Sequence, residues 1–188
     1  MLINNLSILM KERNVKNAVL SLKTCISKNT ISQLSNNKNS MIQMETINKI
    51  CQVLDILPND FFEYSPYDVS FGYEIEEGYN YDDGCRKVDV YAVILITKNN
   101  NAVDEFVLEG YQQEEVYNFD NFYISDEDYL IKKVDLQLNK SKKQKLITDY
   151  FSIQLVTYIK NQLSEFIFEE LNSIEKQSIS NGFHVEIN

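Results

Sequence analysis

Apolar positions at the start of the chain return every three or four residues, which is the period of an amphipathic helix. A first helix is predicted to end at Lys11 and Arg13, and its inner residues are Leu2, Leu6, Leu9 and Met10. A second helix is predicted from about Lys16 to Lys23, and its partly inward residues are Ala18, Leu20 and Leu22. Two short helices therefore open the chain.

A third short helix is predicted after a tight turn at Thr24–Ser27. Ser27 suits the N-cap position, because its hydroxyl can accept a hydrogen bond from a free backbone N–H of the first turn. Ile31 and Leu34 lie three residues apart and are expected to face the core, whereas their neighbours are polar. The pair Asn36-Asn37 is expected to end the helix, since Asn tolerates the left-handed backbone common at helix ends.

Two more helices complete the predicted bundle. The fourth has an i, i+3, i+4, i+7 apolar row that consists of Ile47, Ile50, Cys51 and Leu54. Pro58 then breaks the pattern, and Asn59 or Asp60 is expected to cap a last turn that buries Phe61 or Phe62. Residues 1–66 thus predict an all-α domain of about five short helices.

The following residues change to the pattern of strands, with β-branched and aromatic side chains between Gly and Asn clusters. Val88–Thr97 and Ala102–Tyr111 are predicted to form a hairpin around a loop of about four residues, Lys98–Asn101. The sequence predicts the secondary structure of four other segments less clearly. Residues 115–124 and 183–188 are candidate strands, Ser125–Asp128 resembles a helix start, and Tyr129–Leu138 fits either period.

A long helical pattern runs from about Ser141 to Lys176, with a break near Ser152 or Ser164. Residues 67–188 are therefore predicted to be an α+β domain with a small antiparallel sheet and one or two long helices. The broad apolar face of 146–174 exceeds what a narrow helix seam needs. It either packs in the chain's own core or forms a dimer surface, and the sequence leaves both open.

Charge divides the 188 residues in the same way. Residues 1–66 contain seven Lys and Arg against five Asp and Glu, and residues 67–188 contain eleven against twenty-three. The acidic domain either keeps the protein soluble or binds a basic protein through Tyr-rich acidic stretches. The candidate partner-binding residues are Glu76, Glu77, Asp82, Asp83, Glu114 and Glu115.

Little in the sequence favours catalysis. Motifs for nucleotide binding or a nucleophilic Ser are absent, and the carboxylate groups do not match a calcium loop. The only histidine is His184, and the cysteines Cys25, Cys51 and Cys85 are widely spaced, which excludes a usual zinc site and favours buried thiols. We expect a cytoplasmic protein that is not an enzyme, with no cofactor, signal peptide or membrane span.

Two stretches carry a resemblance to a known family: "LSLKTCISKNTISQLSNNK" and "INKICQVLDILPNDFFEY". They resemble the helix-turn-helix domain of lambda-repressor/Cro-like (XRE-type) regulators. The chain departs from the usual pattern at three positions, with Cys25 and Asn37 where Gly is usual and Ser21 where Ala is usual. Cys25 is expected to carry a modest strain if its φ is positive.

The resemblance implies that the third helix enters the major groove of DNA. The base-reading residues it implies are Lys28, Asn29, Ser32 and Gln33, whose side chains can pair with base edges. The phosphate-contacting residues it implies are Asn17, Thr30, Asn36, Lys38 and Asn39. The few Lys and Arg residues predict a modest affinity per protomer, which dimerisation would raise.

The expected function is therefore a sequence-specific transcriptional regulator, a homodimeric repressor of phage or mobile-element type. An alternative is an anti-CRISPR-like inhibitor, whose helix-turn-helix head controls its own promoter while the acidic domain binds a basic nucleic-acid enzyme. A further alternative is a DNA-binding antitoxin with an acidic toxin-masking tail. All three share double-stranded DNA as a partner of the first domain.

Overall fold

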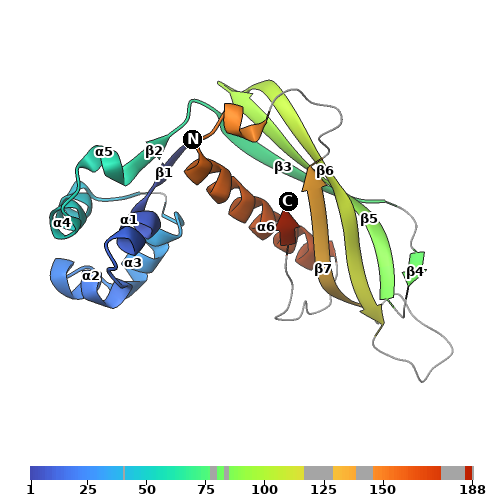
Figure 1. Ribbon diagram of the computed structural model, residues 1–188, viewed down its shortest axis with the longest axis horizontal. Helices are drawn as coiled ribbons and strands as arrows, with labels where there is room; N and C mark the ends of the chain where they lie inside the picture. The colour runs from blue at the N-terminus through green and yellow to red at the C-terminus, as the bar shows by residue number, and fades with distance from the viewer. Residues whose placement is uncertain are drawn as a thin grey trace. The chain divides into compact units, whose positions relative to one another are not determined.

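The computed structural model describes residues 1–39, 41–76, 80–82, 85–116, 129–138, 146–174 and 185–187 (Figure 1). Side chains are described for these residues except 80–82, 85, 114–116, 129–133, 172–174 and 185–187. The chain divides into two compact units, Met1–Pro66 (unit 1) and Tyr67–Asn188 (unit 2). Within the described part, no helix has the length and apolar character needed to span a bilayer.

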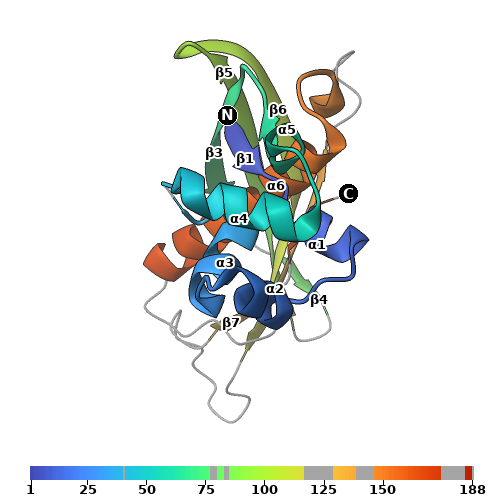
Figure 2. The same cartoon turned by 90° about the vertical axis from the view of Figure 1, so that its left-hand side faces the viewer.

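Unit 1 is a bundle of short helices closed by a two-stranded sheet (Figure 2). The helices are α1 (Leu6–Glu12), α2 (Asn17–Thr24), α3 (Lys28–Ser35), α4 (Met44–Leu54) and α5 (Pro58–Phe61). Their inward residues form one core, which includes Leu6, Leu20, Ile31, Ile50 and Phe61, each fully buried. The predicted bundle of about five helices is confirmed.

The two-stranded sheet was not predicted. Strand β1 (Leu2–Asn4) pairs antiparallel with β2 (Phe62–Tyr64), which brings the two ends of unit 1 together. Leu2 was expected on the inner face of the first helix, but it lies in β1 and is 61% exposed. The expected helical inward positions of Ala18 and Leu22 are also wrong, since both side chains are exposed and only Leu20 of that row is buried.

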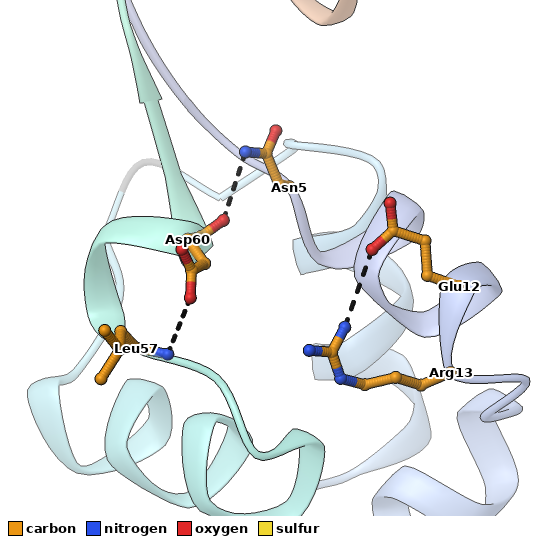
Figure 3. A network of polar contacts seen from close by, with 5 residues as sticks. All are labelled: Asn5, Glu12, Arg13, Leu57 and Asp60. Atoms are coloured by element: carbon orange, nitrogen blue, oxygen red, sulfur yellow. Dashed lines mark hydrogen bonds and ion pairs between the residues drawn. The ribbon is translucent and has the colours of Figure 1, made fainter.

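Side-chain caps fix the last helical turn of unit 1 beside this sheet (Figure 3). The Asp60 carboxylate accepts a 3.0 Å hydrogen bond from the backbone N–H of Leu57, the residue before α5. The Asn5 amide donates to the backbone carbonyl of Asp60 at 3.3 Å, and the backbone N–H of Asn5 donates to Phe61 at 2.8 Å. Asp60 therefore caps α5, as one of the two predicted alternatives, and Phe61 is the buried aromatic.

The described residues of unit 2 form a six-stranded sheet with one long helix. The strand order is β3-β5-β6-β7-β8, and β4 pairs with β5 beyond the end of β3. All pairs are antiparallel except β7–β8, which is parallel. The strands are β3 (Asp68–Ile75), β4 (Asn80–Asp82), β5 (Cys85–Lys98), β6 (Asn101–Val116), β7 (Tyr129–Leu138) and β8 (Val185–Ile187).

The predicted hairpin is confirmed, but its loop is shorter than expected. Lys98 pairs with Asn101, so only Asn99 and Asn100 lie between β5 and β6. Both have positive φ, 51° and 63°. This is the backbone that two-residue hairpin turns require, and Asn adopts it more readily than most residues.

Helix α6 (Ile153–Ile174) lies along one face of the curved sheet (Figure 1). Its buried residues include Leu155, Ile159 and Leu163, and Phe166 stacks on Phe71 of β3 with ring centroids 5.8 Å apart. The apolar face of this helix thus packs in the core of unit 2, one of the two alternatives left open by the sequence. Whether unit 2 also forms a dimer stays a prediction.

The long helical pattern predicted from about Ser141 is interrupted near Ser152, one of the two expected break positions, and α6 begins after it. A 3₁₀ turn, Ile147–Asp149, precedes α6, and the Ser152 hydroxyl accepts a 3.3 Å hydrogen bond from the Leu155 backbone N–H. Ser152 therefore begins the helix, because its side chain satisfies an N–H that has no partner inside the first turn. The fold class of unit 2, an antiparallel sheet with a long helix, is confirmed.

Candidate DNA interface

The turn between α2 and α3 contains three residues, Cys25, Ile26 and Ser27. Cys25 has φ 59° and ψ 22°, so its φ is positive and the condition for strain at this residue is met, at a position where Gly would carry none. Two hydroxyls hold the turn: Ser21 donates to the Ile26 carbonyl at 2.7 Å, and Thr24 accepts from the Ile26 N–H at 3.3 Å. Side chains of α2 therefore fix the turn by hydrogen bonds to both the carbonyl and the N–H of Ile26.

Ser27 caps α3 as predicted. Its hydroxyl oxygen accepts a 3.0 Å hydrogen bond from the backbone N–H of Thr30. The hydroxyls of Ser27 and Thr30 are also 2.8 Å apart, within hydrogen-bonding distance. Thr30, predicted to contact phosphate, is thus part of the cap itself, with a half-buried side chain.

Helix α3 presents two chemically distinct faces. Ile31 and Leu34 are 0% and 1% exposed and anchor the helix in the core of unit 1. The predicted base-reading residues lie on the other side: Lys28, Asn29 and Gln33 are exposed, and Ser32 is half-buried. The structure thus places these four side chains on one helix, and three of them are exposed.

Asn37 fixes the far end of α3 through a contact that the sequence analysis missed. It has φ 53°, and its Oδ1 accepts hydrogen bonds from the backbone N–H and the Nδ2 of Asn4, both at 2.7 Å. Its own Nδ2 donates to the Asn4 carbonyl at 3.1 Å. Asn4 is 7% exposed and also donates to the Leu34 carbonyl, so strand β1 is joined directly to the end of α3.

Comparison with known proteins agrees with this geometry. Residues 5–67 match the family model described as the Cro/C1-type HTH DNA-binding domain. Unit 1 contains a Cro/C1-type helix-turn-helix domain. A solved structure, described as a "putative DNA-binding protein from Bacteroides fragilis", is 25% identical, and the similarity covers 34% of this chain and 100% of that one with a TM-score of 0.32. No curated protein matches the chain.

The predicted phosphate-contacting residues of the helix-turn-helix domain lie at both ends of the α2–α3 pair. Asn17, the first residue of α2, is exposed beside a surface depression of about 260 Å³ that Lys11 and Lys16 also line. Asn36 and Lys38 are exposed beyond the end of α3. Asn39 is half-buried, and its role as a phosphate contact stays a prediction.

The charges of the helix-turn-helix domain are distributed unevenly. We call residues 13–44, which include both helices and their flanks, the α2–α3 segment. It contains no Asp or Glu, and its cations are Arg13, Lys16, Lys23, Lys28 and Lys38. The acids lie on either side of this segment, and two of them are close to cations: Glu12 is 3.7 Å from Arg13, and Glu45 is 2.6 Å from Lys49. The hydrogen bond from Lys49 lowers the pKa of the Glu45 carboxyl. The α2–α3 segment is thus cationic although the whole chain is acidic, and the sequence already carried that signal.

The remaining predicted residues belong to unit 2. Glu76 is exposed at the end of β3, where its carboxylate accepts a 3.4 Å hydrogen bond from the Tyr91 hydroxyl. Asp82, Glu114 and Glu115 lie in strands β4 and β6, but their side chains are outside the description. Glu77, Asp83 and His184 are outside the described residues, as are most of 115–124 and all of Ser125–Asp128.

The expectation of buried thiols is confirmed for Cys51 and wrong for Cys25, and the side chain of Cys85 is outside the description. Cys51 is 6% exposed in the core, and burial raises the pKa of its thiol. Cys25 is exposed in the turn between α2 and α3. Among the described residues, no group of three or more His, Cys, Asp and Glu is placed to hold a metal ion.

Proposed function

We propose that the protein is a sequence-specific regulator of transcription that reads DNA through α3. The observation that carries this proposal is the row of exposed polar side chains on α3, in a Cro/C1-type domain whose α2–α3 segment contains cations and no acids. Lys28 suits guanine, because an ammonium donates to the O6 and N7 acceptors, and Asn29 and Gln33 suit adenine. Asn17 and Lys38 position the domain through phosphates.

Repression as a homodimer is part of this proposal. Five cations on the α2–α3 segment give limited electrostatic attraction per protomer, so one copy binds weakly. Two copies on a palindrome add their contacts, and half-sites one helical turn apart match a two-fold symmetric pair of domains. A repressor of phage or mobile-element type fits this arrangement. Such a protein acts where the DNA lies, in the bacterial cytoplasm.

Mobility shifts with DNA selected from a random library test the proposal. Replacing both Lys28 and Gln33 by Ala should abolish the preference for the selected sequence over random DNA. The matched control is Lys49→Ala, which removes one cation from α4, where Lys49 is paired with Glu45. That control should keep the sequence preference. An unchanged preference in the double variant would show that α3 does not read the bases.

A second candidate function is an inhibitor of the anti-CRISPR kind, in which unit 2 binds a basic nucleic-acid enzyme. The observation that favours it is the acidic sheet surface around Tyr91, where Glu76 accepts its hydrogen bond. Carboxylates in such a surface can occupy the Lys and Arg positions that otherwise hold nucleic acid. Full-length variants in which carboxylates of this surface are reversed distinguish this candidate from a regulator.

A further inference from the structure

Helix α6 packs on one of the two faces of the sheet of unit 2. Side chains at even positions between Val88 and Ile96 of β5 are buried toward α6, and so are Phe106 and Leu108 of β6. Tyr150, just before α6, lies on the same face. Its ring centroid is 6.3 Å from that of Phe106, and its hydroxyl donates a 2.9 Å hydrogen bond to Asp104. No described helix of unit 2 packs on the opposite face. We call that opposite face the outer face.

Apolar side chains lie in the middle of the outer face. Val93 of β5 is directly opposite Val107 of β6, and Leu95 is the next outward residue of β5. Gly72 of β3 pairs with Val93 on the other side and adds no side chain to cover it. A solvated face of an antiparallel sheet ordinarily alternates to polar residues. An apolar centre on this face is a feature of interaction surfaces.

Tyrosines and carboxylates surround that centre. Tyr91 pairs with Glu74 on β3 and with Glu109 on β6. Glu76 accepts the hydrogen bond from the Tyr91 hydroxyl. The charge of Glu76, with burial and the charges of Glu109 and Asp89, raises the pKa of Tyr91. Carboxylates of β3, β5 and β6 thus gather around Tyr91.

The other end of the apolar centre is also acidic. Glu105 is exposed opposite Leu95. A cation of the outer face, Lys87, lies 5.6 Å from the ring centre of Tyr111 at the far end of the sheet. The surface is thus an apolar and aromatic centre with carboxylates at both ends, the composition of a protein interface with a charged rim.

We propose that the outer face binds a protein surface that presents Lys and Arg side chains around an apolar centre. A second copy of this chain is a poor occupant, because a symmetric pairing of the face with itself would bring Glu74 and Glu105 against carboxylates of the other copy. A nucleic acid is excluded for the same reason, since phosphates would face the same carboxylates. The proposal deepens the inhibitor candidate by naming its surface and the chemistry of its partner.

The test uses the full-length chain and peptides selected from a random displayed library for binding to it. Selected peptides should combine Lys or Arg with apolar residues. Glu74→Lys with Glu105→Lys should weaken their binding at least tenfold. The matched control reverses two exposed carboxylates of α6, Glu165→Lys with Glu169→Lys, and should change the affinity less than threefold.

Three outcomes would overturn the proposal: selected peptides without cationic residues, equal loss of affinity in both double variants, or no peptide binding above background. Self-association of the chain that is abolished only by the outer-face variant would also overturn it, and sedimentation measures this. The mobility shift of each variant is measured in parallel. Absence of any DNA preference in the natural chain, with intact peptide binding, would count against the regulator alone, so the two proposals fail separately.

Discussion

Asn37 combines two roles at the residue scale. Its positive φ ends α3, for which Gly would serve at no steric cost. Its side chain, however, also holds the buried Asn4 of β1 by three hydrogen bonds. Lambda-repressor/Cro-like regulators, which this domain resembles, usually have Gly here, and these hydrogen bonds give a physical reason for Asn. A glycine would keep the turn and leave the polar groups of Asn4 without these partners.

We therefore expect Asn37→Gly to lower the free energy of unfolding by about 1–3 kcal/mol, because buried polar groups lose their hydrogen bonds. Urea denaturation of the full chain, followed by a signal from unit 1, measures the change. Asn36→Ala is the control, since Asn36 is exposed, and it should stay within about 0.5 kcal/mol. Equal stability of Asn37→Gly and the natural chain would contradict the prediction.

Gly110 is required at the residue scale in unit 2. A Cβ on Gly110 would lie 1.8 Å from the backbone carbonyl oxygen of Asp135 on β7. Backbone atoms of β7 cannot move aside without breaking its hydrogen bonds to β6. We expect Gly110→Ala to destabilise unit 2 by about 2 kcal/mol or more, as measured by thermal unfolding.

Gly72→Ala is the matched control for that prediction. A Cβ on Gly72 would have Val93 Cβ as its neighbour at 3.9 Å, an ordinary van der Waals contact. Its effect should remain within about 0.5 kcal/mol. If the two alanine variants melt at the same temperature, the close approach of β6 to β7 at Gly110 is wrong.

At the element scale, the cap of α3 links stability to recognition. Ser27→Ala removes the acceptor for the Thr30 N–H and should cost about 1 kcal/mol in urea denaturation. Ser27→Asp keeps an acceptor and should preserve stability. It also adds a negative charge to the segment free of acids, so it should weaken DNA binding in a mobility shift. Equal DNA affinity for both variants, once corrected for the folded fraction, would contradict the assignment of this segment to DNA.

How far the sequence predicts an element depends on the range of the contacts that form it. Helices α3 and α4 follow from their own apolar period and caps, and the β5–β6 hairpin follows from its turn residues. Strand β1 does not, because its three residues gain their structure only from β2, about sixty residues later. The start of α6 is predicted only in part, since Leu146 and Ile147 continue the apolar pattern and Ser152 is one of two candidate breaks in it.

The candidate site shows the same division. Exposed positions on α3 follow from the helical period, which made Lys28, Asn29 and Gln33 predictable as outward residues. The amide contact of Asn37 with Asn4 joins residues 33 positions apart and leaves no local pattern. The outer face of unit 2 was equally hidden, because strand register decides which side chains share a surface.

At the scale of the whole molecule, the net charge of −10 opposes DNA binding, and the cations of the helix-turn-helix domain supply the attraction to phosphates. If the cations of residues 13–44, five in number, all meet phosphates, log affinity should fall with log salt concentration with a slope of about −4.5 per protomer at most. Fluorescence anisotropy between 50 and 200 mM salt, roughly the range where such slopes are read, measures it. A much steeper slope would mean that residues outside this segment contact the backbone of the DNA.

The pairing of β1 with β2 has a consequence for synthesis on the ribosome. The Met1 amino group donates to the Ser65 carbonyl at 2.7 Å, and the Ser65 N–H donates back to Met1 at 2.9 Å. Residues 1–4 must therefore wait during synthesis for residues 62–65 before they gain their partners. A nascent chain arrested just after α4 should remain sensitive to protease at its start, and one extended past Ser65 should become resistant there.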